Sequence, residues 1–221
     1  YSELSKTITT SLDKNEKKNN GIYFTSQELI GRMIKMLGRR RFKRILEPCY
    51  GSGEFIRALG KKYKKSKIEG IEMNDTMTEL CEGDEGINKE NVYLIRGDYL
   101  KTEFEGDYDL IIGNPPFYVM KRGDVEEGYT PYIEGRPNIF VLFILKSLKL
   151  LKKGGILCFV LPSSFKNCLY YNKLRELIEK TCTIIGIEDC EGAKWLETTQ
   201  ETMILCVKKK VGKNGEWVIK K

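Results

Sequence analysis

Segments typical of β-strands alternate with segments typical of α-helices along most of the chain. The strand-like segments are short and apolar, and they cover 41–48, 66–73, 91–98, 108–114, 156–162 and 201–210, with a weaker one near 184–187. The helix-like segments are 25–38, 54–65, 138–151 and 171–180. Strands separated by helices pair in parallel through right-handed crossovers. The sequence therefore predicts an α/β fold with a doubly wound, mostly parallel sheet of about seven strands, in which we expect the last core strand to be antiparallel.

One large domain, from 21 to 210, is predicted between two short terminal segments. Residues 1–20 are polar and are expected to form a mobile arm. Apolar positions on one face predict a first helix, capped by Thr25 with Glu28 and ended by Gly38. A later helix, 138–151, is expected to end at Gly154 and Gly155.

The last segment, 211–221, contains an Asn-Gly pair at 214 and 215. Because this pair favours a tight two-residue turn, the segment is expected to form a hairpin or to begin a further domain.

Composition excludes several kinds of chemistry. The chain has no histidine, so we expect neither a Ser-His-Asp triad nor a histidine-ligated metal, and no metal is required. The seven cysteines are dispersed and form no C-x-x-C pair, which indicates reduced thiols in a cytoplasmic protein. No apolar run is long enough to span a bilayer, and the N-terminus has no signal-peptide pattern, so no membrane partner is expected.

The formal net charge is +7, with basic segments at 39–44 and 61–67. A basic face favours a polyanionic partner such as nucleic acid. Lysine-rich surfaces are also common without such a partner, so charge alone leaves both readings open.

Polar residues follow several of the predicted strands, where ligands of doubly wound sheets bind. Gly51 and Gly53 lie in a strand-to-helix turn and let the backbone approach a ligand closely. Glu72 follows the next strand and is placed to accept hydrogen bonds from ribose hydroxyls, while Asp98 is placed to accept one from an adenine amino group. A solvated strand end is the plainer reading of Glu72, and a turn former is that of Asp98.

Glu47 indicates which of the possible ligands such a site would bind. It stands at the end of the first strand, beside the glycine turn, where a carboxylate would repel a pyrophosphate. A ligand that carries an amino acid and a sulfonium would be attracted instead. This favours S-adenosylmethionine over NAD or ATP, and the chain also lacks the G-x-x-x-x-G-K-[ST] phosphate loop.

The segment from 114 to 117, Asn-Pro-Pro-Phe, ends an apolar strand. Proline cannot donate to a sheet ladder, and the residue before a proline is held extended. The Asn114 side-chain oxygen and the Pro115 carbonyl therefore form a rigid set of acceptors, next to the aromatic face of Phe117. Such acceptors can draw an exocyclic amine toward tetrahedral geometry and stabilise its developing positive charge. The plainer reading is a strand that ends in a proline turn.

These segments together resemble the N6-adenine DNA methyltransferases of the gamma arrangement. The matching segments are "FTSQELIGRMI", "ILEPCYGSGEF", "IEGIEMN", "RGDYL", "LIIGNPPF", "PNIFVLFILKSLKLLKKGGILCFVLPSSF" and "ETMILCV". The resemblance implies a Rossmann-like methyltransferase fold with S-adenosylmethionine as the cofactor. It also implies methyl transfer to the N6 amine of adenine in DNA, with the base flipped out of the duplex, as part of restriction-modification.

The resemblance further implies a role for individual residues. The catalytic residues would be Asn114, Pro115, Pro116 and Phe117. The cofactor-binding residues would be Thr25, Glu47, Cys49, Gly51, Gly53, Glu72, Met73, Asp98, Tyr99, Asn114 and Pro116. Phe117 and Trp195 would stack on the two faces of the flipped base, although a core position is an equal alternative for Trp195.

Two departures from the family pattern matter. The turn residues Cys49 and Tyr50 differ from those usual in the family, which leaves their contacts open. The family also carries a target-recognition domain after the last strand, where 211–221 stands here. Recognition is therefore expected to come from a missing segment or from a separate domain or subunit, and 211–221 could be the start of that domain.

Other acceptors remain open, because the Asn-Pro-Pro-aromatic corner suits any planar amine. An adenine or guanine amine of RNA is one alternative, and a glutamine amide of a protein is another. A non-catalytic binding subunit with the same fold is a third, and the intact corner at 114–117 argues against it.

Overall fold

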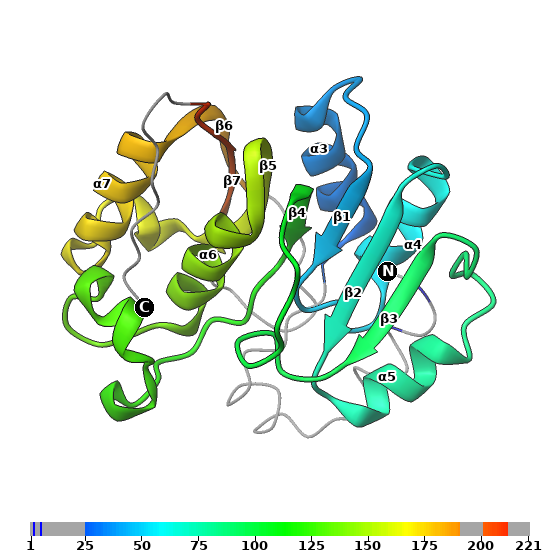
Figure 1. The fold of residues 1–221 in the computed structure, drawn as a ribbon, viewed down its shortest axis with the longest axis horizontal. Helices are drawn as coiled ribbons and strands as arrows, with labels where there is room; N and C mark the ends of the chain where they lie inside the picture. Colours follow the sequence, from blue (N-terminus) through cyan, green and yellow to red (C-terminus); the bar gives the residue numbers. More distant parts are fainter. Residues whose placement is uncertain (1, 3–4, 6–24, 191–200, 212–221) are drawn as a thin grey trace.

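In the computed structural model, which describes residues 2, 5, 25–190 and 201–211, the predicted strand segments all join one seven-stranded sheet (Figure 1). The order of the strands is β3-β2-β1-β4-β5-β7-β6. Their bounds are β1 Arg44–Glu47, β2 Lys67–Glu72, β3 Val92–Arg96, β4 Tyr108–Gly113, β5 Leu151–Pro162, β6 Cys182–Asp189 and β7 Thr202–Lys209.

Strand directions agree with the sequence prediction. β1 pairs in parallel with β2 and β4, and the neighbouring pairs β2–β3 and β4–β5 are also parallel. The last strand, β7, lies between β5 and β6 and is antiparallel to both. The doubly wound, mostly parallel sheet of seven strands with an antiparallel last strand is therefore confirmed.

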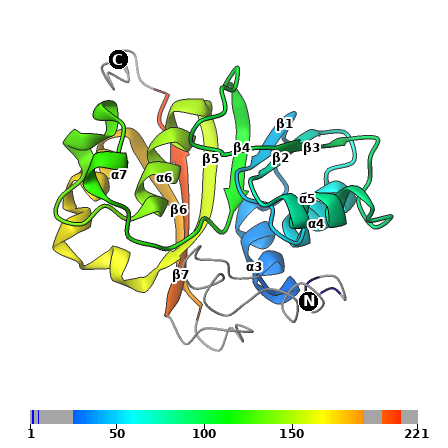
Figure 2. The same ribbon diagram turned by 90° about the horizontal axis from the view of Figure 1, so that it is seen from below.

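Helices cover both faces of this sheet (Figure 2). Their bounds are α3 Gln27–Leu37, α4 Glu54–Lys62, α5 Asp75–Glu82, α6 Ile139–Leu150 and α7 Asn172–Thr181, with short 3-10 turns at Arg122–Asp124, Glu127–Tyr132, Ser163–Lys166 and Leu169–Tyr171. Buried side chains of α3 and α4 pack on one face, and those of α6 and α7 pack on the other. Each face thus has its own hydrophobic core, and the sheet separates them.

Three predicted helix ends are wrong. Ser26, not Thr25, caps α3, since its hydroxyl accepts from the Leu29 amide at 3.2 Å. α4 ends at Lys62, short of the predicted residue 65, because Tyr63 leaves the helical conformation.

Gly154 and Gly155 do not end α6, which stops at Leu150; they lie inside β5. A Cβ on Gly155 would stand only 2.8 Å from the Tyr108 carbonyl oxygen, so this glycine lets β5 approach β4. The predicted stop at Gly38 is confirmed, with φ of 64°.

Parts of the predicted organisation fall outside the described residues. Of the expected arm at 1–20 only Ser2 and Ser5 are described, and the hairpin predicted at 214 and 215 lies outside. All seven cysteines are free thiols, of which Cys49 and Cys168 are half-buried and the others buried. Within 25–190 and 201–211, no helix has the length and apolar character needed to cross a membrane.

Candidate active site

The carboxyl ends of β1 and β4 lie side by side and bring two predicted corners together. β1 ends at Glu47 and β4 ends at Gly113, directly before Asn114. A Cβ built on Gly113 would lie 3.5 Å from Cγ of Glu47 and 3.4 Å from Cδ of Pro48. The sheet thus places the Glu47 carboxylate next to the Asn-Pro-Pro corner, although 66 positions separate Glu47 from Gly113 in the chain.

A hydrogen bond also joins the two turns that follow these strands. The Cys49 thiol donates to the Asn114 carbonyl at 3.2 Å. Burial raises the pKa of Cys49 well above its usual value, and the nearby Glu47 and Glu72 carboxylates raise it further. The thiol is therefore a neutral donor rather than a thiolate.

The glycine turn has the backbone conformation that its sequence predicts. Gly51 has φ of 51° and Gly53 has φ of 76°, in the left-handed region that favours glycine. A Cβ on Gly53 would stand 3.2 Å from the Cys81 sulfur and 3.3 Å from Nη1 of Arg57. The Gly51 amide donates to Oε2 of Glu72 at 2.9 Å. This bond links the turn to the end of β2.

Burial makes the charged forms of Glu47 and Glu72, at the carboxyl ends of β1 and β2, unfavourable. Glu47 is only 1 % exposed. Burial raises its pKa well above the ordinary value, and the charge of Glu72 raises it further. Burial likewise raises the pKa of Glu72, against the hydrogen bonds from the amides of Asn74 and Gly51. A cation bound between these side chains would stabilise the ionised form of both.

An unsatisfied atom makes this edge suitable for the expected cofactor. Oε2 of Glu47 is buried, and it has no hydrogen-bond partner among the residues that the structure describes. Burying a carboxylate oxygen without a partner is costly, so a bound ammonium or sulfonium would meet a group prepared for it. The residues present therefore fit the amino-acid and sulfonium end of S-adenosylmethionine.

Thr25 lies just before α3, at the end of that helix that faces the start of α4. It is buried and directly precedes Ser26, the N-cap of the helix. The Gln27 side-chain amide donates to Oε2 of Glu54, the first residue of α4. The first turns of α3 and α4 are thereby joined, and Thr25 lies at the end of α3 nearest the glycine turn.

The residues expected at the adenine end of the cofactor have three different surroundings: a turn, the core and the solvent. Oδ1 of Asp98 accepts from the Leu100 amide at 2.9 Å, so Asp98 does form a turn, and its other oxygen lies 3.6 Å from Nζ of Lys101. The Tyr99 hydroxyl forms a 2.9 Å hydrogen bond with Ser147 in the core. Met73 is 68 % exposed. A role for any of them in binding a cofactor stays a prediction.

The loop that begins at Asn114 is attached to the start of α6. The Ile139 amide donates to the Tyr118 carbonyl at 3.0 Å, and the Met120 amide donates to the Pro137 carbonyl at 2.8 Å. Pro115 is buried, while Asn114 and the two residues after Pro115 are half-buried. The corner is thus held in place and accessible from one side.

Aromatic side chains that the sequence reading missed support Phe117. Its ring meets Phe140 of α6 edge-on, with centroids 6.1 Å apart and planes at 90°. Phe140 in turn contacts Phe165 at 6.2 Å and Tyr171 at 5.0 Å. The clue in the sequence was the position of Phe165, just beyond the carboxyl end of β5, where ligands of such sheets bind. Trp195, predicted to face Phe117, lies outside the described residues.

Solved structures share this architecture. A putative class I S-adenosylmethionine-dependent methyltransferase from Listeria monocytogenes superimposes with a TM-score of 0.76 at 19 % identity, covering 96 % of this chain and 66 % of that one. A methyltransferase from Pyrococcus furiosus gives a TM-score of 0.61 at 19 % identity, covering 93 % and 94 %. At such identities the likeness shows the fold alone.

Curated relatives are more similar in sequence. The modification methylase CviBIII of Paramecium bursaria Chlorella virus NC1A is 29 % identical over 217 residues, covering 96 % of this chain and 56 % of the relative. The type II methyltransferase M.AccI of Acinetobacter calcoaceticus is 28 % identical over 214 residues, covering 92 % and 39 %. The chain thus spans roughly half the length of these relatives, or less.

A family model matches most of the chain. The match covers residues 5–195, which include the glycine turn, both carboxylates and the Asn-Pro-Pro-Phe corner. The chain belongs to the Eco57I restriction-modification methylase family.

Proposed function

We propose that this chain transfers a methyl group from S-adenosylmethionine to the N6 amine of adenine in DNA. The observation that carries the proposal is the contact between the ends of β1 and β4. This contact brings Glu47, whose Oε2 has no hydrogen-bond partner among the described residues, beside the corner at Asn114, and it supports the binding of one methyl donor between them. The names of the curated relatives, modification methylase and type II methyltransferase, support a DNA substrate.

The cofactor would supply an activated methyl group on a sulfonium. Glu47 would face its positively charged amino-acid end, and Glu72, beside the Gly51 amide, would accept from the ribose hydroxyls. The turn glycines let the backbone lie close to the ligand. Thr25 would contact the methionine end, from the start of α3.

The Asn114 corner would act on the amine. The lone pair of an exocyclic adenine amine is delocalised into the ring, so the amine is a poor nucleophile. The Asn114 side-chain oxygen and the Pro115 carbonyl would accept its two hydrogens and stabilise the positive charge that develops during attack. Positioning of the amine in line with the sulfonium supplies most of the remaining acceleration.

A paired base could not reach this corner. Phe117 is half-buried and supported from behind by Phe140, so the adenine would have to leave the duplex and stack on the Phe117 ring. Trp195 would cover the other face of the base. Because the chain spans only part of its relatives, we assign recognition of the surrounding DNA sequence to a further domain or a separate subunit.

Nucleoside mass spectrometry tests the proposal. The protein would be incubated with S-adenosylmethionine carrying a deuterated methyl group and, in separate reactions, with duplex DNA, single-stranded RNA and an unfolded protein mixture. We expect labelled N6-methyladenine from DNA, and none when Asn114→Ala replaces the native protein. Label on cytosine, on RNA or on glutamine would assign the acceptor to another class and overturn the proposal.

A further inference from the structure

The two basic segments noted in the sequence come together in the fold. The ring of Phe42, within the first segment, lies 5.4 Å from the ring of Tyr63, within the second. The Ser66 hydroxyl donates to the Phe42 carbonyl at 2.6 Å, and the Lys67 amide donates to the Lys43 carbonyl at 2.8 Å. Packing of these buried aromatic rings therefore forces the basic side chains around them onto one surface.

The cations on this surface are exposed, and their side chains have no acidic partner among the described residues. We call this group the basic cluster; its members are Arg39, Arg41, Lys43, Lys61, Lys62, Lys64 and Lys65. None of them forms an ion pair with a carboxylate in the described part of the chain.

The buried carboxylates at this end of the sheet are already compensated. Glu69 is bound by Arg44 at 3.1 Å and by Lys67 at 3.0 Å. Asp109 pairs with Lys152 and accepts from the Lys43 amide at 2.7 Å. These two buried carboxylates therefore do not neutralise the positive charge of the basic cluster.

The basic cluster lies at the end of the sheet opposite the candidate active site. Its loops lead into β1 and β2, at the upper end of the sheet in Figure 1, whereas Glu47 and Asn114 follow the other ends of β1 and β4. The six residues of β4, at about 3.3 Å each, separate the two ends by roughly 20 Å. The basic cluster therefore lies away from the corner that would receive the target base.

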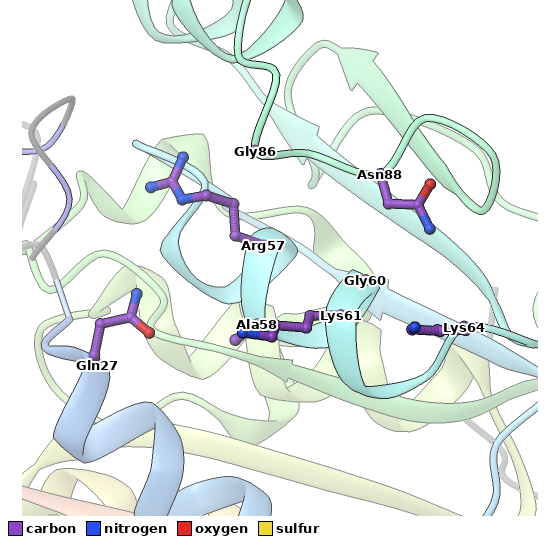
Figure 3. A pocket seen from close by; sticks show the side chains of 8 residues that line it. All are labelled: Gln27, Arg57, Ala58, Gly60, Lys61, Lys64, Gly86 and Asn88. Atoms are coloured by element: carbon purple, nitrogen blue, oxygen red, sulfur yellow. The ribbon is translucent and has the colours of Figure 1, made fainter.

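A hollow extends the basic cluster along α4. It has a volume of about 460 Å³ and is bordered by Lys61 and Lys64 of the cluster, with Gln27 and Asn88 among its other residues (Figure 3). Arg57 also borders it but is occupied by Asp84. Gln27 is likewise occupied by Glu54. Lysines around an open hollow, with the Asn88 amide as a further donor, suit the oxygens of a phosphate group.

We propose that the basic cluster binds the phosphate backbone of duplex DNA, at a site separate from the one that receives the target base. The inference rests on DNA being the substrate under the proposed function, but not on which base is methylated. A second contact of this kind would hold the protein near DNA without reading sequence, because phosphate contacts carry no sequence information.

Removal of three lysines tests this site. The variant Lys61→Gln/Lys62→Gln/Lys64→Gln would be titrated with a non-target duplex of about 12 base pairs, long enough for several phosphate contacts. At low salt we expect two duplexes per native protein and one per variant. The weaker of the two binding events in the native protein should depend steeply on salt, since each phosphate contact adds about 0.9 to the slope of log K against log salt. This weaker event should be absent from the variant.

A matched variant controls for net charge. Lys35→Gln/Lys173→Gln/Lys180→Gln removes the same charge from exposed positions on α3 and α7, and it should still bind two duplexes. Single-turnover methylation of a short target duplex at saturation should be equal in the native protein and both variants. Thermal unfolding of each variant would establish that it is folded.

Three outcomes would overturn the inference, and a fourth would refute only the proposed function. If both variants still bind two duplexes, the cluster is an ordinary solvated surface. Loss of methylation in the Lys61 variant would place these lysines at the target site itself. Single-stranded RNA would be titrated in parallel, and a loss of binding by the lysine variant that is confined to RNA would assign the surface to another partner. Absence of N6-methyladenine with the two-duplex stoichiometry intact would instead refute the proposed function and leave this site standing.

Discussion

The Cys49 thiol donates a hydrogen bond to the backbone carbonyl of Asn114, across a distance of 3.2 Å. This contact joins the turn after β1 to the corner after β4, two segments that the sheet already places side by side. Because burial raises the pKa of Cys49, the thiol stays protonated and remains a donor. The contact fixes the direction in which the peptide at Asn114 points, and with it the acceptors that follow.

Substitution of Cys49 tests this link. Cys49→Ser keeps a donor of similar size, and we expect near-native stability and turnover. Cys49→Ala leaves the carbonyl without that donor, which should cost about 1 kcal/mol of unfolding free energy. Misplacement of the corner should lower kcat roughly tenfold. Denaturant unfolding and steady-state kinetics would measure both, and identical behaviour of the two variants would show that the thiol bond has no effect.

Asn114→Ala addresses the acceptor itself. If the side-chain oxygen stabilises charge that develops only during transfer, kcat should fall by about 10²–10³-fold, while the Kd of the cofactor changes little. Isothermal titration calorimetry and single-turnover methylation separate these effects. An equal loss of cofactor affinity and turnover would mean that Asn114 supports the fold of the corner and has no catalytic part.

Glu47 makes the affinity for the cofactor depend on pH. Burial raises the pKa of Glu47 well above 4.5 in the unliganded protein, so its ionised form destabilises that state, and folding stability should decline as the pH rises from about 4.5 toward the raised value. A bound cation lowers this pKa. Cofactor binding should therefore release a proton and strengthen as the pH rises through the same interval.

Calorimetry in buffers of different ionisation enthalpy would count that proton. Glu47→Gln removes the titrating group but keeps the shape, so binding should release no proton and lose at least about tenfold in affinity, or about 1.4 kcal/mol. The unliganded variant should be more stable than the native protein at neutral pH. Proton release that persists in Glu47→Gln would place the titration at another residue, such as Glu72.

Much of the fold was predictable because its signals are local and periodic. The apolar run 108–114 and the donor-free prolines after it predict both a buried strand and its end. The helix α5 was missed because Asp75–Glu82 is short and mostly polar, and it buries only Met77, Thr78 and Cys81. Its capping residue, Asn74, accepts from the Met77 amide at 3.0 Å and was the one available clue.

The candidate site was predictable as a set of strand ends, but not in its detail. Position along the chain does not specify where a side chain points: Tyr99 follows Asp98 and yet its hydroxyl bonds Ser147 in the core. The support of Phe117 by Phe140 and the Cys49–Asn114 contact are tertiary, between residues more than twenty positions apart. The convergence of two basic segments away from the site was also invisible, since it depends on Phe42 packing against Tyr63.

The buried carboxylate of Glu54, at the start of α4, is the common partner of three residues that precede β1. Gln27 donates to one oxygen, and the Ser5 hydroxyl and the Ser2 amide donate to the other at 2.5 Å and 2.6 Å. Burial alone would raise the pKa of Glu54, but the hydrogen bonds from Ser5 and Ser2 and the charge of Arg57 lower it. The ionised carboxylate thus holds the start of α3 against the start of α4.

Glu54→Ala should therefore affect one end of the cofactor more than the other. Under the proposed function α3 contacts the methionine end, so release of α3 should weaken S-adenosylhomocysteine by at least about tenfold, or about 1.4 kcal/mol. 5′-Methylthioadenosine, which lacks the amino acid, should bind the variant as it binds the native protein. Calorimetry with both ligands makes the comparison, and Glu28→Ala, an exposed change on α3, is the control. Equal weakening of both ligands would show that Glu54 supports the glycine turn as a whole and does not position α3.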